Sequence, residues 1–92
     1  GGSKWSEALA LRGLGILSLR ENDYSQTEIL YKESHSLFKK SHEKTGEIKI
    51  LIDLGDLYRL QSKYETARKL IEEAYTVSNK IKYKYGEAKA LW

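Results

Sequence analysis

Histidine and carboxylate side chains are the residues of this sequence with the widest range of possible chemistry. The two histidines, His35 and His42, are seven residues apart. Seven residues of helix rise about 10 Å, so the two rings would share a face but lie too far apart to bind one metal ion without other ligands. His35 falls on an apolar stripe, which favours a half-buried ring that forms a hydrogen bond. The sequence therefore predicts no metal site.

The other reactive side chains favour structural roles. Glu33, Glu72 and Glu73 stand near lysines in helical patterns, which is typical of solvated faces and ion pairs. Tyr24 and Tyr64 begin equivalent helical segments, where a ring can pack while its hydroxyl stays in water. The chain has no Cys, which excludes a thiol nucleophile, a disulfide scaffold and a zinc ribbon. We therefore expect no catalytic residues and no cofactor.

The charge of the chain is small and positive. Its 16 Lys and Arg residues against 13 Asp and Glu give a net charge of +3 over 92 residues, which is low for a dedicated nucleic-acid binder. Lysines gather near the expected ends of two helices, where cations complement the helix dipole. Weak nucleic-acid binding by a helical repeat is the alternative function, and a steep salt dependence would indicate it. These lysines are Lys39, Lys40 and Lys44 in one helix and Lys80, Lys82 and Lys84 in the other.

A 40-residue repeat organises the sequence. Residues 7–46 aligned with residues 47–86 share eleven identities, including Leu14 with Leu54 and Gly15 with Gly55. A third copy starts at Glu87. We assign residues 7–46 to repeat 1, 47–86 to repeat 2 and 87–92 to the truncated first helix of repeat 3, whereas residues 1–6 are a lead-in that starts with a remnant of cloning.

Each repeat is predicted to contain two helices. Apolar residues recur at helical spacing in both halves of the unit, with polar breaks between them. The predicted helices lie near residues 4–20, 24–44, 47–60 and 64–84, and a stub spans residues 87–92. Gly46 and Gly86 suit the left-handed residue that ends a helix. Gly15 and Gly55, inside helices, predict a close approach of another helix at the same position of each repeat.

The doubled pattern resembles the tetratricopeptide repeat (TPR). Repeat 2 has Leu54-Gly55-x-x-Tyr58 followed by Tyr64-x-x-Ala67, which is similar to the family pattern. A period longer than the usual 34 or so residues is similar to the extended repeats of kinesin light chains and bacterial signalling regulators. The resemblance implies an all-α fold of tandem antiparallel helix pairs that form a right-handed α-solenoid fragment. The first copy keeps Leu14, Gly15 and Tyr24 but has Ser18, Thr27 and Ser34 where the family has Tyr, Ala and Ala.

The same resemblance implies a function in protein–protein interaction. TPR units stack so that their first helices line a concave groove. The residues carried over to this groove are mainly apolar and basic, which suits an acidic or amphipathic peptide segment. The family's clamp for a terminal carboxylate is not expected, because Ile16 and Asp53 stand where that clamp has Asn. The implied peptide-binding residues are Leu9, Arg12, Ile16, Leu19, Arg20, Lys49, Ile52, Asp56, Arg59, Leu60, Lys89 and Trp92.

Self-association is a second expectation. Two repeats and a stub cannot cover both ends of a helical array. We expect exposed leucines on the first helix and exposed residues such as Val77, Ile81 and Trp92 at the other end. A homo-oligomer would form by end-to-end stacking or by helix exchange through a straightened break at residues 61–63. The lack of Cys fits a cytoplasmic location, and no apolar run is long enough for a membrane span.

Overall fold

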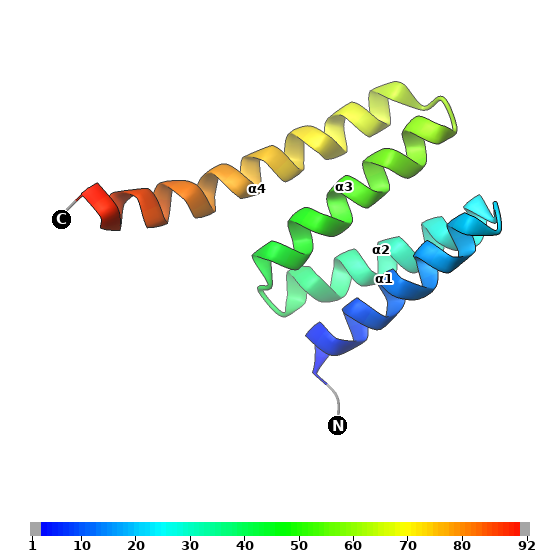
Figure 1. Ribbon diagram of the computed structural model, residues 1–92, viewed down its shortest axis with the longest axis horizontal. Coiled ribbons are helices and arrows are strands. Elements are labelled where there is room, and N and C mark those ends of the chain that lie inside the picture. The colour runs from blue at the N-terminus through cyan, green and yellow to red at the C-terminus, as the bar shows by residue number, and fades with distance from the viewer. Residues whose placement is uncertain (1–2, 91–92) are drawn as a thin grey trace.

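Four helices in two antiparallel pairs make up the molecule. The computed structural model describes residues 3–90, with side chains up to residue 81, and all regular structure in this range is helical. In Figure 1 α1 packs beside α2, α2 beside α3 and α3 beside α4. The predicted all-α fold of tandem antiparallel helix pairs is confirmed. The helices are α1 (Lys4–Arg20), α2 (Tyr24–Lys40), α3 (Lys44–Leu60) and α4 (Tyr64–Ala90).

Three links of identical length connect the helices. The second residue of each link is left-handed, with φ of 63° at Asn22, 59° at His42 and 63° at Ser62. The amide of the third link residue donates a hydrogen bond to the carbonyl oxygen five residues earlier, over 2.9, 3.0 and 2.8 Å along the chain. These bonds satisfy carbonyl groups that a helix end leaves free, as in a Schellman motif. The helices therefore start at intervals of twenty residues.

The predicted helix ends at Gly46 and Gly86 are wrong. α2 ends at Lys40 and α3 already begins at Lys44, because His42 rather than a glycine takes the left-handed position. Gly46 lies buried inside α3, where the ring of Phe38 occupies the space that a Cβ atom would need. α4 continues through residue 86 to Ala90. The assignment of residues 87–92 to a third repeat stays a prediction from the sequence.

Short polar side chains start the first two helices. The side chain of Ser3 accepts a hydrogen bond of 3.1 Å from the amide of Ser6, and Asp23 accepts one of 3.1 Å from the amide of Gln26. Both bonds satisfy one of the amides that the first turn of a helix leaves free. Ser3, assigned from the sequence to the lead-in of residues 1–6, is thus the N-cap of α1.

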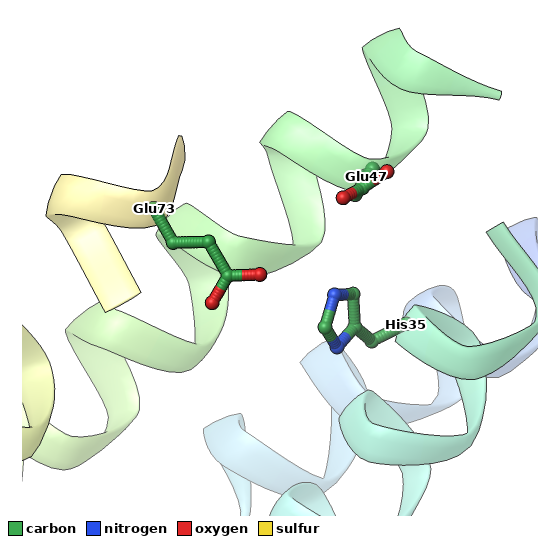
Figure 2. A group of neighbouring side chains, drawn as sticks. All are labelled: His35, Glu47 and Glu73. Atoms are coloured by element: carbon green, nitrogen blue, oxygen red, sulfur yellow. The ribbon is translucent and has the colours of Figure 1, made fainter. Parts of the chain in front are cut away.

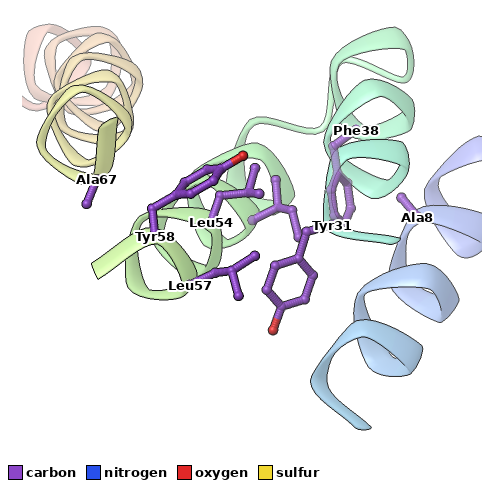
Figure 3. Packing of buried hydrophobic residues seen from close by; sticks show 8 residues of the cluster. Ala8, Tyr31, Phe38, Leu54, Leu57, Tyr58 and Ala67 are labelled. Atoms are coloured by element: carbon purple, nitrogen blue, oxygen red, sulfur yellow. The ribbon is translucent and has the colours of Figure 1, made fainter. Parts of the chain in front are cut away.

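The main core lies between the two helix pairs. Tyr31 and Phe38 of α2 pack between Ala8 of α1 and the α3 residues Leu54 and Leu57, as Figure 3 shows. All five side chains are at most 2% exposed. The burial of apolar area is the main favourable contribution to such a fold, so α2 and α3 hold the two pairs together.

Close approach of helices explains two of the glycines. A Cβ atom on Gly15 would lie 2.5 Å from the ring of Tyr31, and one on Gly55 would lie 2.6 Å from Cδ1 of Ile71. Both distances are shorter than van der Waals contact. The predicted close approach at the same position of each repeat is confirmed. Among the described residues, no helix is both long and apolar enough to cross a bilayer.

Candidate interaction surface and a polar cluster between helices

An open apolar groove runs along α3 and α4. We call it the α3–α4 groove, and its volume is about 700 Å³. Large apolar side chains of α4 remain accessible in it: Tyr64 is 65%, Ile71 42% and Tyr75 69% exposed. The α3 side is bounded by Gly55, Asp56 and Arg59, and the α4 side by Tyr64, Ala67, Arg68, Ile71, Glu72, Tyr75 and Thr76.

Charged side chains around the α3–α4 groove are paired with each other. Arg59 lies 3.6 Å from Asp56, and Arg68 lies 3.0 Å from Glu65 and 3.9 Å from Glu72. These pairs are exposed and water screens them, so each contributes little to stability. Their guanidinium groups can therefore exchange a local carboxylate for one from a ligand at small cost.

Seven of the residues predicted to bind a peptide are exposed. The α3 members recur at helical spacing, which places them on one face of that helix. Asp56 and Arg59 bound the α3–α4 groove, and Ile52, 41% exposed, lines a smaller hollow beside it together with Ile71 and Tyr75. The exposed members of the set are Leu9 and Arg20 on α1 and Lys49, Ile52, Asp56, Arg59 and Leu60 on α3.

Three other members of the predicted set are half-buried. Nε of Arg12 lies 2.5 Å from Oδ2 of Asp53, an ion pair that joins α1 to α3. Ile16 and Leu19 pack against the main core. These three residues therefore connect elements of the fold as well as facing outward. Lys89 and Trp92 lie outside the residues whose side chains the structure describes.

A separate polar cluster joins three helices. His35 of α2, Glu47 of α3 and Glu73 of α4 each offer one donor atom, and these atoms lie within 4.8 Å of one another. Figure 2 shows the three side chains on their separate helices. Glu47 is only 3% exposed. Nε2 of His35 and Oε1 of Glu47 are both buried without a hydrogen-bond partner among the described residues. A buried polar atom without a partner is costly, so this cluster needs a physical explanation.

The surroundings of His35 favour a neutral imidazole. Burial lowers the pKa of His35, and Lys39 lowers it further, whereas Glu73 and Glu47 act in the opposite direction. The sequence predicted a half-buried ring that makes a hydrogen bond. The ring is half-buried, but its Nε2 has no such partner.

A family model now accounts for the repeat. The model described as Tetratricopeptide repeat matches residues 6–80, which is most of the chain. The chain belongs to the tetratricopeptide repeat family. Comparisons with curated proteins and with solved structures find no match. TPR units generally mediate protein–protein interaction, and the family is typically non-catalytic.

Sequence reasoning missed the α4 side of the groove in this TPR protein. Ile71 and Tyr75 recur at helical spacing with Ala67 and Ala74, a pattern that by itself predicts a packed face. In the structure they face the α3–α4 groove, because among the described residues α3 is the helix that packs extensively against α4 and it leaves this face of α4 open. The exposure of their stripe is a property of the neighbouring helices, which the sequence of α4 alone does not specify.

One hydrogen bond between the TPR repeats was also not predicted. The hydroxyl of Tyr58, at the family's Tyr position in α3, donates to a carboxylate oxygen of Glu28 in α2. This bond lowers the pKa of Glu28, assisted by Lys32 and opposed by partial burial. Burial raises the pKa of Tyr58, and the bond to Glu28 adds to that rise. The pair therefore favours an ionised Glu28 with a protonated Tyr58.

The lysines occupy positions different from those predicted. Lys39 and Lys40 do lie in the last turn of α2. Lys44 is instead the first residue of α3, and Lys80 lies within α4. Lys39, Lys44 and Lys80 bound a second hollow of about 470 Å³, whose walls also include Glu47 and Glu73. The side chains of Lys82 and Lys84 lie outside the described residues.

Proposed function

We propose that this TPR unit is a non-catalytic scaffold that binds an acidic or amphipathic peptide segment as a helix in the α3–α4 groove. The observation that carries the proposal is the exposure of Tyr64, Ile71 and Tyr75 in one groove of about 700 Å³. An amphipathic helix placed in an apolar groove buries its own apolar face and leaves its polar face in water. The groove has the two large aromatic rings that commonly anchor such interfaces.

Charge complementarity supports a ligand with acidic residues. Arg59 and Arg68 stand on opposite sides of the groove, and each is paired only with exposed carboxylates. Lys49 is also exposed on α3. Arginine forms bidentate hydrogen bonds with carboxylates, which fixes the orientation of a ligand as well as attracting it.

Calorimetric titration with synthetic peptides tests the groove. The probe is a helix-forming peptide with leucines on one face and glutamates on the other, and a scrambled peptide of the same composition is its control. Tyr75→Ala should weaken binding of the probe, whereas Ile29→Ala should not, because Ile29 is 52% exposed on α2, outside the groove. Equal affinity for both peptides, or equal effects of both substitutions, would contradict the proposal.

A second pair of variants tests the acidic preference. Arg59→Ala removes a cation from the groove, and Lys40→Ala removes an exposed cation from the end of α2. Only Arg59→Ala should weaken binding at low salt, and the difference should shrink as salt screens the charges. If both variants bind the probe as the original chain does, the ligand is amphipathic without an acidic requirement.

We also propose that this chain self-associates end to end. The outer face of α1 exposes Leu9 by 40%, Leu14 by 52% and Leu17 by 53%, and α4 exposes Ile71 and Tyr75 at the other end of the helix array. Val77 does not contribute as expected, because it packs against Leu51 and Ala74 and is only 9% exposed. A head-to-tail contact between two different faces is a heterologous interface.

Sedimentation velocity at several concentrations tests self-association. Leu17→Asp and Tyr75→Asp should each lower the average mass, whereas Ile29→Asp should not. A strict monomer at high micromolar concentration would exclude self-association. If the stacked form uses the α3–α4 groove, the peptide probe should also compete with it.

A further inference from the structure

A half-buried histidine and two glutamates at the junction of α2, α3 and α4 have the features of a metal site. Their three donor atoms, one from each helix, lie within 4.8 Å of one another. Glu47 is almost fully enclosed by the protein, with only 3% of its surface exposed. Oε1 of Glu47 and Nε2 of His35 have no hydrogen-bond partner among the described residues. The nearest cation to Oε1 of Glu47 is Nζ of Lys44 at 3.6 Å, beyond hydrogen-bond distance, so both buried atoms remain able to accept a ligand.

From this geometry we propose that His35, Glu47 and Glu73 bind one divalent transition-metal ion of the zinc type. Zinc sites that keep one position open use three protein ligands, drawn from imidazole, carboxylate and thiolate groups, with water as the fourth. Zn–N and Zn–O bonds of about 2.0–2.2 Å require donors about 3–4 Å apart, so binding would draw these donors together by about 1 Å. Glu73 can supply most of that movement, because its side chain reaches the cluster from α4 through rotatable bonds (Figure 2).

An open position for water is available next to the cluster. Glu47 and Glu73 also line the hollow of about 470 Å³ that Thr76, Val77 and Ile81 help to enclose. This hollow gives the ion a path from solvent and leaves room for a fourth ligand. A neutral imidazole is the form that binds metal, and the two carboxylates balance the charge of a divalent ion.

A lysine beside the hollow competes with the ion, and the imidazole ligand decides which cations are preferred. Nζ of Lys44 lies 3.6 Å from Oε1 of Glu47, so it competes with a metal ion for that carboxylate. Its side chain is 53% exposed, however, and can turn into water. Ca²⁺ and Mg²⁺ prefer oxygen ligands and gain little from imidazole, whereas Zn²⁺ binds it well. We therefore expect selectivity for transition metals over the alkaline-earth ions.

The site would connect the two repeats. His35 belongs to repeat 1, and Glu47 and Glu73 belong to repeat 2. An ion bound here would stabilise the packing of α2 against both helices of the next unit, because it binds only the folded arrangement. Equivalent positions elsewhere in the chain lack this set: Tyr75 stands where repeat 1 has His35.

Direct titration of the chain with Zn²⁺ tests the proposal. Isothermal calorimetry should give one ion per chain, and Zn²⁺ should raise the melting temperature, whereas Ca²⁺ and Mg²⁺ should do neither. Co²⁺ absorption provides a spectroscopic readout of the imidazole ligand. No stoichiometric Zn²⁺ binding, or an equal response to Ca²⁺, would overturn the proposal.

Matched variants distinguish this site from general binding to carboxylates and histidines. Glu73→Gln and His35→Gln should abolish the stoichiometric binding and the shift in melting temperature. Glu33→Gln, at the position of repeat 1 that corresponds to Glu73, and His42→Asn, in the α2–α3 link, should preserve both. Glu73 is the least buried of the three proposed ligands, so the Glu73→Gln variant should fold. Circular dichroism verifies its folding. Retention of zinc binding in folded Glu73→Gln and His35→Gln would overturn the proposal.

One more variant should tighten Zn²⁺ binding instead of abolishing it. Lys44→Gln removes the competing ammonium group beside Glu47 and should tighten Zn²⁺ binding. A purely structural role for Glu47 would not produce this gain. Weaker binding in this variant would contradict the assignment of Glu47 as a ligand.

Discussion

Equivalent leucines in the two repeats have opposite surroundings. Leu14 and Leu17 of α1 are 52% and 53% exposed, whereas Leu54 and Leu57, forty residues later in α3, are 2% and 0% exposed. The difference arises because α3 packs against both α2 and α4, whereas α1 packs closely only against α2. The same sequence position is therefore a core residue in one repeat and a surface residue in the other.

The second helices show the reverse difference. Tyr31 of α2 is 2% exposed because α3 covers it, but Ile71, its counterpart in α4, is 42% exposed. In a helical array each unit is covered by its neighbours, so burial depends on the order of the units. In the described chain the outer faces of α1 and α4 are therefore exposed, while α2 and α3 contribute most of the buried core.

The largest difference in stability should come from substitutions at the equivalent positions Leu57 and Leu17. Leu57→Ala removes a fully buried side chain and should lower the free energy of unfolding by about 2–5 kcal/mol. Leu17→Ala changes the equivalent but exposed position and, at protein concentrations low enough to keep the chain monomeric, should alter it by about 0.5 kcal/mol or less. Urea denaturation of both variants measures the two effects. Equal losses would mean that the outer face of α1 is covered in solution, as self-association would require.

The two glycines at helix contacts should give a smaller difference. Gly15→Ala places a Cβ atom 2.5 Å from the buried ring of Tyr31 and should destabilise the chain by about 1–3 kcal/mol through overpacking. Gly55→Ala meets Cδ1 of Ile71, which can turn into the α3–α4 groove, so its cost should be lower. Thermal denaturation compares the two variants. A larger cost at Gly55 would contradict the proposed freedom of Ile71.

Substitution of a third glycine, Gly13 in α1, should raise the stability of the chain instead of lowering it. A Cβ atom on Gly13 would meet nothing within 4 Å, and the residue is exposed in the interior of α1. Gly13→Ala should therefore stabilise the chain by about 1 kcal/mol, because alanine favours the helix without a clash. The measurement is the urea midpoint relative to the original chain. A loss of stability would indicate that the outer face of α1 contacts another helix.

The smallest expected effect concerns the hydrogen bond between Tyr58 and Glu28. Tyr58→Phe should cost below about 1 kcal/mol near neutral pH, since water screens the partly exposed carboxylate. The pKa of Glu28 is lowered in the folded chain, so this contribution is present above the unfolded pKa of about 4.3 and is lost as pH falls through the folded value. The difference between the original chain and the variant should therefore shrink below about pH 4.

Guanidinium denaturation at several pH values measures that difference. Glu28→Gln serves as the partner variant, because Tyr58→Phe should have little further effect once the carboxylate is gone. Repeat 1 has Ser18 at the position of Tyr58, so the bond exists only between α3 and α2. A difference that stays constant down to pH 3 would show that the ionised carboxylate does not contribute.

Local patterns predicted the helices better than their ends. The recurrence of apolar residues gave the four helices, and the two helices that follow Ser3 and Asp23 begin where those caps allow. The α2–α3 boundary was misplaced because His42, a non-glycine residue, adopts the left-handed conformation. Gly46 was available as a conventional helix end, but it serves the packing of Phe38 instead.

The composition of the α3–α4 groove and of the polar cluster around His35 follows only from the tertiary structure. The predicted peptide-binding set came from first helices, but the α3–α4 groove also uses Ile71 and Tyr75 of a second helix. Likewise, His35 was weighed only against His42 on the same helix, whereas its neighbours in space are Glu47 and Glu73. Spacing along one helix cannot show which residues of three helices meet.

The amino-acid sequence is enough to predict a duplicated two-helix unit, its family resemblance and the close helix contacts at Gly15 and Gly55. These follow from periodicity and from residue size, which act within one unit. The tertiary structure decided which copy of each position is buried and which polar side chains converge. Burial and convergence depend on the neighbours in space, so two nearly equivalent repeats acquire different surfaces from one shared pattern.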